Sequence, residues 1–460
     1  MKRILTITML TLRAAIRYRL VALMSFIMLA GVVGLPLILK DDGTARGFTQ
    51  ILLAYTLTLI TALLGFVTLW LACGTLAKEI SESQMQLVAV KPIPRWQIWV
   101  GKWLGLVILN AFLIALTGGC VYFLLLWRAN QLPADQQAIL RNEILVARAS
   151  IKEPVPNYAQ DVEHILKERL ATSQPPAGTD LQSVRTVLLE QVKARNQIVP
   201  PGYMRRWDLN LGFAKSFLVD RPLYVRTKFN AAVTNVSGAY LGMWEVGPLD
   251  TPKVMRRPMN LSDNSFHEFE IPANLFDEAG VLSIQFSNAS ETALLFSDEE
   301  GMELLYREGG FGLNFARGLA IVLCWISLLA ALGLAASSLL SFPVAAFVTL
   351  GVLFVTFSSG TLKQVVDEGG IMGVNHETGF TENPSVIDTF AVPIAKALLG
   401  LLRMVTEFSP IDSLANGRSI TWSVLAVAVL QIIGLLGGIL ATIGIAIFNG
   451  RELAATQGGS

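Results

Sequence analysis

The stretch from Lys78 to Lys102 reads KEISESQMQLVAVKPIPRWQIWVGK. It is charged, contains two prolines and separates two apolar runs, Ile51–Cys73 and Ile98–Trp127. About 20 mostly apolar residues suffice for a helix to cross a bilayer, and both runs are that long. A connector this short between two such helices stays at the membrane surface. Its charged side chains indicate that it meets something there; they are Glu79, Glu82, Lys91, Arg95 and Lys102.

The composition of the 460-residue chain is that of a membrane protein. Only 15% of the residues are charged and 53% are hydrophobic, whereas soluble proteins carry about 25% charged residues. The net charge of +1 gives no indication of a nucleic-acid partner. All three cysteines lie inside apolar runs, so we expect no disulfide framework. They are Cys73, Cys120 and Cys324.

Six apolar runs predict six transmembrane helices. A shorter apolar run, Phe390–Leu402, predicts a re-entrant or interfacial helix. The residues before the first span alternate apolar and basic side chains at helical spacing, which predicts an amphipathic interfacial helix; a simple topology signal is the alternative. The six predicted spans are Leu20–Leu39, Ile51–Cys73, Ile98–Trp127, Phe315–Leu340, Phe342–Ser359 and Trp422–Phe448.

The distribution of charge predicts the orientation of these spans. Five basic and no acidic residues precede the first span, and basic residues concentrate in cytoplasmic loops. Residues 360–421 carry seven acidic and four basic residues, as expected outside. We therefore predict a multi-pass protein of the cytoplasmic (inner) membrane, with both termini cytoplasmic and residues 128–310 outside.

The large insert at 128–310 predicts a soluble domain. It holds 19 Lys and Arg against 23 Asp and Glu, so it is not a polybasic lipid-binding surface. Residues 131–200 are predicted helical, with helices at Ala134–Ile151, Ala159–Thr172 and about Thr179–Asn196. Residues 203–307 predict an antiparallel β-sandwich, of which a jelly roll is one form. Its expected strands are Leu223–Phe229, Ala239–Val246, Phe266–Ile271, Val281–Ser287, Ala293–Phe296 and Met302–Tyr306.

The predicted fold is thus an α-helical polytopic membrane protein with an inserted extracytoplasmic α+β domain. Residues 1–127 form an N-terminal membrane half with the interfacial helix and spans one to three. Residues 128–310 form the external domain. Residues 311–460 form a C-terminal membrane half with spans four to six and the helix at about 390–402.

Motifs for catalysis are missing from the sequence. No stretch matches G-x-x-x-x-G-K-[ST], so we expect no ATP hydrolysis by this chain. The three histidines are scattered, and a metal site is not expected. Glu268 and Glu270 share one face of a predicted strand, which we interpret as a solvated face. The sequence therefore predicts no catalytic, cofactor-binding or metal-binding residue.

Two polar residues interrupt the predicted spans. Asn110 and Gln431 either hydrogen-bond between packed helices or mark a substrate path. The spans lack the buried ion pairs expected of a proton-coupled or ion-coupled carrier. This absence favours an energy source outside the membrane domain.

The connector itself predicts a rigid amphipathic helix at about Lys78–Val90, which Pro92 and Pro94 end. Because such a helix is attached directly to two spans, a partner that pushes it would move both. The alternative is an ordinary interfacial connector.

These features together resemble the ABC-2 type permease family, the membrane subunits of one class of ATP-binding-cassette exporters. The resemblance rests on the basic amphipathic start, the six-span layout with a broken segment near Phe390–Leu402, and the closing run from Phe448 to Glu452. It also rests on the connector, where Glu79 and Leu87 precede Pro92 to Arg95 and Gly101-Lys102. The match covers about 1–127 and 311–452. The large insert departs from the family, whose typical members have a short loop there.

The resemblance implies that the connector is a coupling helix that docks on a separate cytoplasmic ATPase subunit, which uses ATP and Mg. It also implies a homodimer or heterodimer with a second permease, in contact with membrane lipid. The insert leaves room for an extracytoplasmic partner. The residues that would couple to the ATPase are Glu79, Glu82, Leu87, Pro92, Arg95 and Lys102.

Two other functions remain open at this point. One is a non-transporting, ATP-driven complex that transmits motion to an extracytoplasmic partner. The other is a membrane-anchored carbohydrate-binding protein, which exposed aromatic residues such as Trp244 or Tyr240 on one sandwich face would favour.

Overall fold

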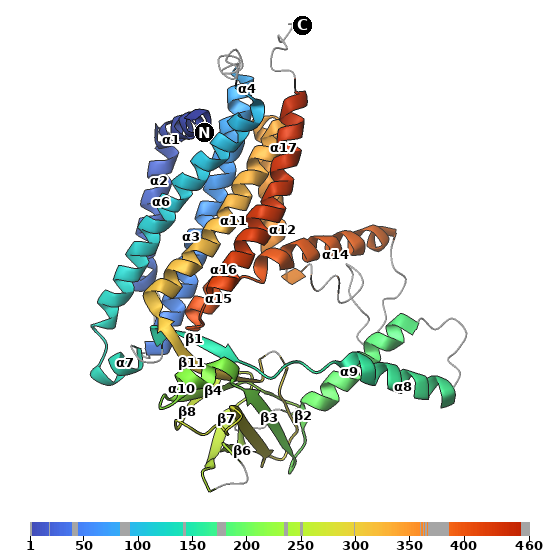
Figure 1. Cartoon of the computed structure of the whole chain (residues 1–460). Coiled ribbons are helices and arrows are strands. Elements are labelled where there is room, and N and C mark those ends of the chain that lie inside the picture. The colour runs from blue at the N-terminus through green and yellow to red at the C-terminus, as the bar shows by residue number, and fades with distance from the viewer. Residues whose placement is uncertain are drawn as a thin grey trace. The chain divides into compact units, whose positions relative to one another are not determined.

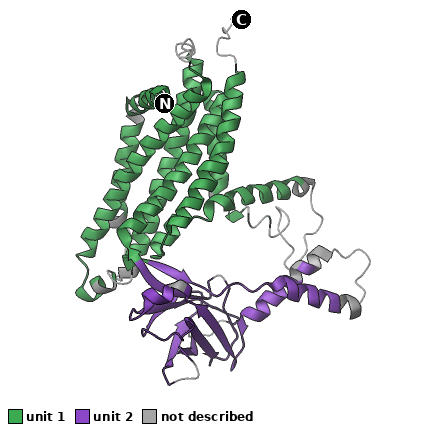
Figure 2. Cartoon of the chain, viewed as in Figure 1, with its two compact units in different colours: residues 1–147, 309–460 green, residues 148–308 purple. Residues whose placement is uncertain are grey.

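A computed structural model describes residues 2–17, 19–38, 45–82, 93–140, 144–172, 181–233, 238–248, 252–298, 300–358, 360–361, 363, 366 and 386–451. The chain divides into two compact units (Figure 2). The first is residues 1–147 together with 309–460, and the second is residues 148–308. The second unit is therefore smaller than the predicted insert, because residues 128–147 belong to the first.

The first unit is helical (Figure 1). Four of its helices are long and apolar enough to cross a membrane, and they are Thr49–Ser81, Arg95–Ala129, Phe311–Leu339 and Trp422–Gly450. The number rises to five if Lys2–Arg17 and Val21–Leu35, bent by 69°, form one span. These helices indicate a membrane protein. The apolar helix in the place of the predicted fifth span, Phe342–Thr356, is shorter, so six spans stay a prediction.

The elements of this unit are as follows. They are α1 (Lys2–Arg17), α2 (Arg19–Ile38), α3 (Ala45–Cys73), the π-helical turn η1 (Gly74–Lys78), α4 (Glu79–Ser81), α6 (Arg95–Ala129), α7 (Ala134–Ile139), α11 (Phe311–Leu339), α12 (Phe342–Phe357), α14 (Val386–Thr406), α15 (Pro410–Ala415), α16 (Trp422–Ala428), the π-helical η4 (Val429–Gly437) and α17 (Gly438–Gly450). The helix expected at 390–402 is therefore present as the longer α14, with Pro393 inside it.

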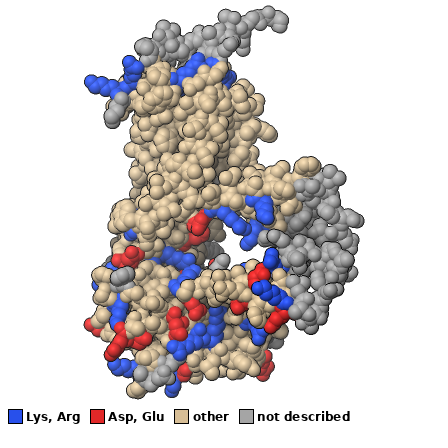
Figure 3. Space-filling view, turned by 45° about the vertical axis from the view of Figure 1, so that its right-hand side comes forward, with Lys and Arg blue, Asp and Glu red and all other residues tan. Residues whose placement is uncertain are grey.

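Charge is unevenly distributed over the helical unit. Figure 3 shows a wide band of uncharged residues, with Lys and Arg gathered at the end where α1 lies. One apolar core runs through the unit and includes residues of α3, α6, α11 and α17. The helices thus present apolar side chains both to one another and outward, as expected for helices in lipid.

The second unit contains a β-sandwich of two four-stranded sheets, ordered β1-β11-β4-β8 and β3-β9-β6-β7. Strands β3 and β4 lie in different sheets, as do β8 and β9, whereas β6 and β7 are neighbours in one sheet, so the jelly roll stays a prediction. Three further strands form a smaller sheet, ordered β2-β10-β5. The strands are β1 (Val146–Ile151), β2 (Ile198–Val199), β3 (Met204–Asn210), β4 (Leu223–Thr227), β5 (Asn230–Ala231), β6 (Ala239–Val246), β7 (Met255–Ser262), β8 (His267–Ile271), β9 (Val281–Asn288), β10 (Leu294–Leu295) and β11 (Met302–Gly310).

Aromatic rings fill the core between the two large sheets. Trp244 of β6 stacks on Trp207 of β3 with ring centroids 6.4 Å apart, and it contacts Phe286 at 4.7 Å. Trp244 is 1% exposed and Tyr240 is 2% exposed. A Cβ atom on Gly242 would lie 2.0 Å from the Phe286 ring, so this position of β6 accommodates glycine alone without rearrangement.

The helix predicted at Ala134–Ile151 is wrong in its second half. The structure has the short helix α7 and then strand β1, Val146–Ile151. The apolar residues there also fit helical spacing, but pairing with a neighbouring strand overrides local preference. The predicted helices at Ala159–Thr172 and about Thr179–Asn196 are confirmed as α8 (Tyr158–Thr172) and α9 (Leu181–Gln197).

Glu268 is not on a solvated face, which corrects a prediction from the sequence. Its side chain is 4% exposed and forms an ion pair with Arg148 of β1. On the strands between them, Arg226 of β4 and Glu303 of β11 are register partners with their charged groups 3.6 Å apart. Ser150 donates a 2.8 Å hydrogen bond to Glu303. These buried charges are paired, as low dielectric requires.

Replacing Trp244 tests the sandwich core. Trp244→Ala removes a fully enclosed ring of the aromatic cluster, and we expect the free energy of unfolding of this unit to fall by about 3–5 kcal/mol. The measurement is thermal unfolding of the full chain in detergent, followed by limited proteolysis at sites within 148–308. Tyr203→Ala is the control, because Tyr203 is 67% exposed; equal losses in both variants would contradict the assignment.

Candidate functional site

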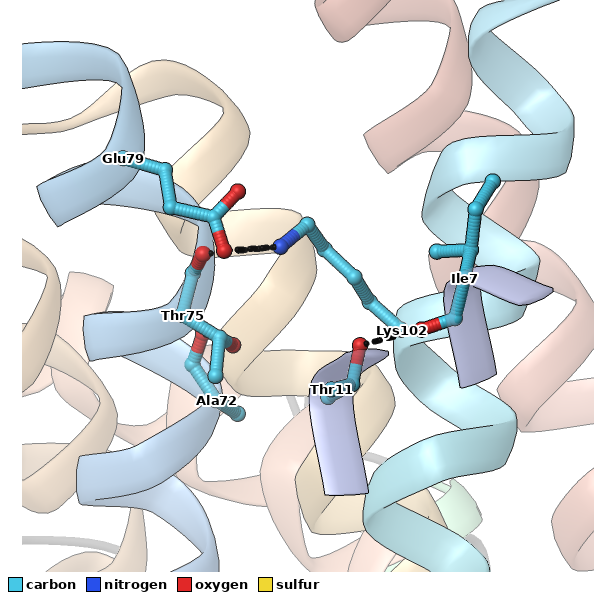
Figure 4. A network of polar contacts seen from close by, with 6 residues as sticks. All are labelled: Ile7, Thr11, Ala72, Thr75, Glu79 and Lys102. Atoms are coloured by element: carbon cyan, nitrogen blue, oxygen red, sulfur yellow. Dashed lines mark hydrogen bonds and ion pairs between the residues drawn. The ribbon is translucent and has the colours of Figure 1, made fainter. Parts of the chain in front are cut away.

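Lys102 joins the two flanks of the connector (Figure 4). Its ammonium group lies 2.6 Å from Glu79 Oε1 and donates a 3.0 Å hydrogen bond to the carbonyl oxygen of Thr75. The Lys102 side chain is 5% exposed and that of Glu79 is 31% exposed. A residue predicted to meet an external partner therefore has its described contacts inside the helical unit.

The carbonyl that Lys102 caps belongs to a π-helical turn. In η1, Gly74–Lys78, the backbone follows the wider i→i+5 pattern, which is rare and appears mostly as single turns near functional sites. Thr75 also donates its hydroxyl to the Ala72 carbonyl, at 3.1 Å. Lys102 thus holds the turn at the end of α3 against α6.

Arg95 fastens the start of α6 to the end of α17. Its Nη1 lies 2.7–2.8 Å from the carbonyl oxygens of Phe448, Asn449 and Arg451, and its guanidinium lies 5.8 Å from the centroid of the Phe448 ring. The last carbonyls of a helix have no partner within it, and a cation is favourable there.

Arg451 repeats this arrangement on a third helix. Its Nη1 donates hydrogen bonds to the carbonyl oxygens of Ser337 and Ser338, at 3.4 and 2.9 Å, where α11 ends. We call Arg95, Lys102 and Arg451 the cap cluster. Arg95 and Arg451 bond carbonyl groups at the C-terminal ends of α17 and α11, whereas Lys102 bonds a carbonyl at the π-helical turn that follows α3. The cluster thus joins α3, α6, α11 and α17.

The amphipathic helix α1 packs against α6 beside the cap cluster. A Cβ atom on Gly101 or Gly105 would lie 2.8 Å from Ile7 or Thr11, respectively. Thr8 donates a 3.1 Å hydrogen bond to the Gly101 carbonyl. The close approach depends on the two glycines, which places the Gly101-Lys102 pair at a helix contact.

The other predicted coupling residues have different outcomes. Glu82 forms an ion pair with Lys78 at 3.6 Å, with both side chains exposed. Leu87 and Pro92 lie outside the described residues, as does most of the helix predicted at 78–90. Its first part, through Ser81, continues the long helix Thr49–Ser81 and does not begin a separate one.

The two polar residues inside the spans hydrogen-bond between helices. Asn110 is 2% exposed, and its Oδ1 accepts a 2.9 Å hydrogen bond from Thr68 of α3. Gln431 of η4 donates a 3.3 Å hydrogen bond to the carbonyl of Met404 in α14. These contacts are those of packed helices.

In the second unit, Asp298 anchors the helical pair α8–α9 to the sandwich. It accepts hydrogen bonds from Tyr158, at 2.7 Å, and from Gln197, at 2.9 Å. Burial, together with the Asp298 carboxylate, raises the pKa of Tyr158 to about 12. Burial also raises the pKa of Glu153, which lines a small cavity with Arg205 and Asp298. The arrangement keeps Tyr158 neutral, so that its hydroxyl donates to Asp298 and helps to hold the helical pair on the sandwich.

The carbohydrate-binding alternative loses the feature that would favour it. Trp244 and Tyr240 lie in the sandwich core and are not on an exposed face. Among the residues that the structure describes, no three His, Cys, Asp or Glu side chains gather in a group that could hold a metal ion.

Comparisons with known proteins leave the function to be argued from the structure. Neither a protein-family model nor a curated protein matches the sequence.

Sequence reasoning missed Thr75 and Arg451 as members of this site. Arg451 belongs to the closing run from Phe448 to Glu452, but its contact with Ser338 joins residues 113 positions apart, which the sequence does not indicate. Nothing in the sequence marks Thr75, because its contribution is a backbone oxygen.

The Glu79–Lys102 pair predicts an asymmetric response to mutation. Glu79→Gln leaves a buried ammonium without its carboxylate, which we expect to lower the melting temperature more than Lys102→Met does. After Lys102→Met, the partly exposed Glu79 can turn to water. The double variant should be more stable than Glu79→Gln alone, as measured by thermal unfolding in detergent.

Glu82→Gln is the control, since exposed pairs contribute about 0–1 kcal/mol. A melting temperature of Glu79→Gln equal to that of this control would show that the buried pair does not hold the turn.

Proposed function

We propose that the chain is the permease subunit of an ABC transporter, an exporter in which a separate ATPase subunit hydrolyses ATP. The proposal is supported by the resemblance of the connector and the closing segment to ABC-2 permeases. It is carried by one observation: the two flanks of the 78–102 connector are joined to each other and to the ends of two further long helices.

The cap cluster would let the connector act on the whole bundle. A partner that displaces the connector moves Glu79 directly, and Lys102 passes that displacement to α6. Arg95 passes it to α17, and Arg451 passes it to α11. Four helices would thus respond to a single push.

The proposal includes the topology expected from the sequence. Six spans would place both termini and the connector in the cytoplasm, in an inner membrane, with the second unit outside. Two permease chains and two ATPases would form the working complex. The ATP and Mg would be bound by the ATPase, and the coupling surface would include Glu82, Leu87 and Pro92 from the connector.

One observation favours the non-transporting alternative. Strand β11 ends at Gly310 and α11 begins at Phe311, so no loop residue separates them. The same strand carries Glu303, one of the buried charges that cross the sheet. In that alternative, the continuous chain from β11 to α11 would link the second unit to the helical unit, and an extracytoplasmic partner would receive the motion.

Recovery of an ATPase is the first test. Affinity purification of the full chain from its native host, followed by mass spectrometry, should recover an ATP-binding-cassette ATPase at a ratio near one to one. The control is an unrelated multi-pass protein with the same tag. Recovery of no ATPase would contradict both ATP-driven functions.

The role of Arg95 in coupling is the second test. Arg95→Gln removes the charge that reaches three carbonyls at the end of α17, so we expect the bound ATPase to lose most of its dependence on the permease. The measurement compares ATP hydrolysis by the complex and by the ATPase alone, in nanodiscs. Arg17→Gln on α1 is the matched control, and unchanged coupling in Arg95→Gln would refute the assignment.

A further inference from the structure

An open groove lies along α1, with Ile108 of α6 in its wall. Its volume is about 450 Å³, and its walls include the apolar side chains of Leu5, Met9, Leu12 and Ile108. Arg13 is the one charged residue among those that line it. The groove therefore combines an apolar channel with a single cation.

The groove continues into an exposed apolar stripe on α6. Ile108, Phe112 and Leu116 follow at four-residue spacing, which places them on one face of the helix. They are 46%, 64% and 39% exposed. Since α6 is long and apolar enough to cross a membrane, this face is suited to a hydrocarbon chain that lies parallel to the helix.

The positive charge of α1 favours a ligand whose polar group is acidic. Residues 2–17 contain Lys2, Arg3, Arg13 and Arg17 and no Asp or Glu. A guanidinium pairs with phosphate oxygens through two parallel hydrogen bonds, and basic residues at a membrane surface attract acidic lipids.

We propose that this groove is a binding site for one acidic phospholipid. Its acyl chain lies along Met9 and Ile108 and continues down the exposed stripe of α6, while Arg13 holds its phosphate. A second copy of the chain is the competing occupant. The basic face of α1 disfavours it, because a two-fold interface at this groove would bring like charges together.

The test is native mass spectrometry of the full chain, titrated with phosphatidylglycerol or with phosphatidylcholine of the same acyl length. We expect one tightly retained phosphatidylglycerol and no matching phosphatidylcholine. Arg13→Ala should weaken its retention about fivefold, which is what one cation near a lipid surface contributes. Arg13→Lys should retain part of the preference.

Matched variants separate this site from general lipid contact. Arg17 is exposed on the same helix but does not line the groove, so Arg17→Ala should weaken retention less than Arg13→Ala does. Ile108→Trp fills the groove and should reduce retention, whereas Phe347→Trp, at an exposed position of α12 outside the groove and the stripe, should not. Equal losses in Arg13→Ala and Arg17→Ala would overturn the proposal, as would a change of oligomeric state in Ile108→Trp with lipid retention intact.

Discussion

The helical unit depends on how the carbonyl groups at the ends of its long helices find donors. Where water is excluded, an unpaired backbone carbonyl costs several kcal/mol, and the last turn of every helix leaves such groups. Here three basic side chains from other segments supply the donors. Because Arg95, Lys102 and Arg451 each bond carbonyl groups of another helix, these hydrogen bonds also hold the helices together.

The sequence predicts those parts of the fold in which apolar and polar residues repeat at a regular spacing along the chain. The long apolar helices follow from composition, and β6 begins and ends where its alternation predicts. Strands β3 and β7 were not predicted, because their arginines reduce the apolar signal. Both are edge strands, where charged residues and Pro258 are tolerated or favoured. The helix-like spacing around Ile151 concealed β1 for a related reason: its pairing depends on residues far along the chain.

In the candidate site, too, the sequence marks some of the residues and not others. Glu79, Arg95 and Lys102 stand out in the sequence because charges in a short connector are conspicuous. Their partners do not, since a backbone oxygen has no sequence signature and Arg95 reaches residues about 350 positions away. Lys102 is buried, contrary to the expectation that it faces a partner, because α6 places it against the π-helical turn and against Glu79, which follows that turn.

The chemistry of the cap cluster suits a joint that has to open and close. Apolar packing between helices resists separation over its whole area, whereas a few charged hydrogen bonds at a helix end can exchange with water or lipid headgroups. Glu79 is 31% exposed and Lys102 only 5% exposed, so releasing the pair costs most at the buried ammonium, which keeps the hydrogen bond to the Thr75 carbonyl. In the proposed permease, the interactions that can be released are thus concentrated where the ATPase would push, and the apolar core that carries the motion remains closed.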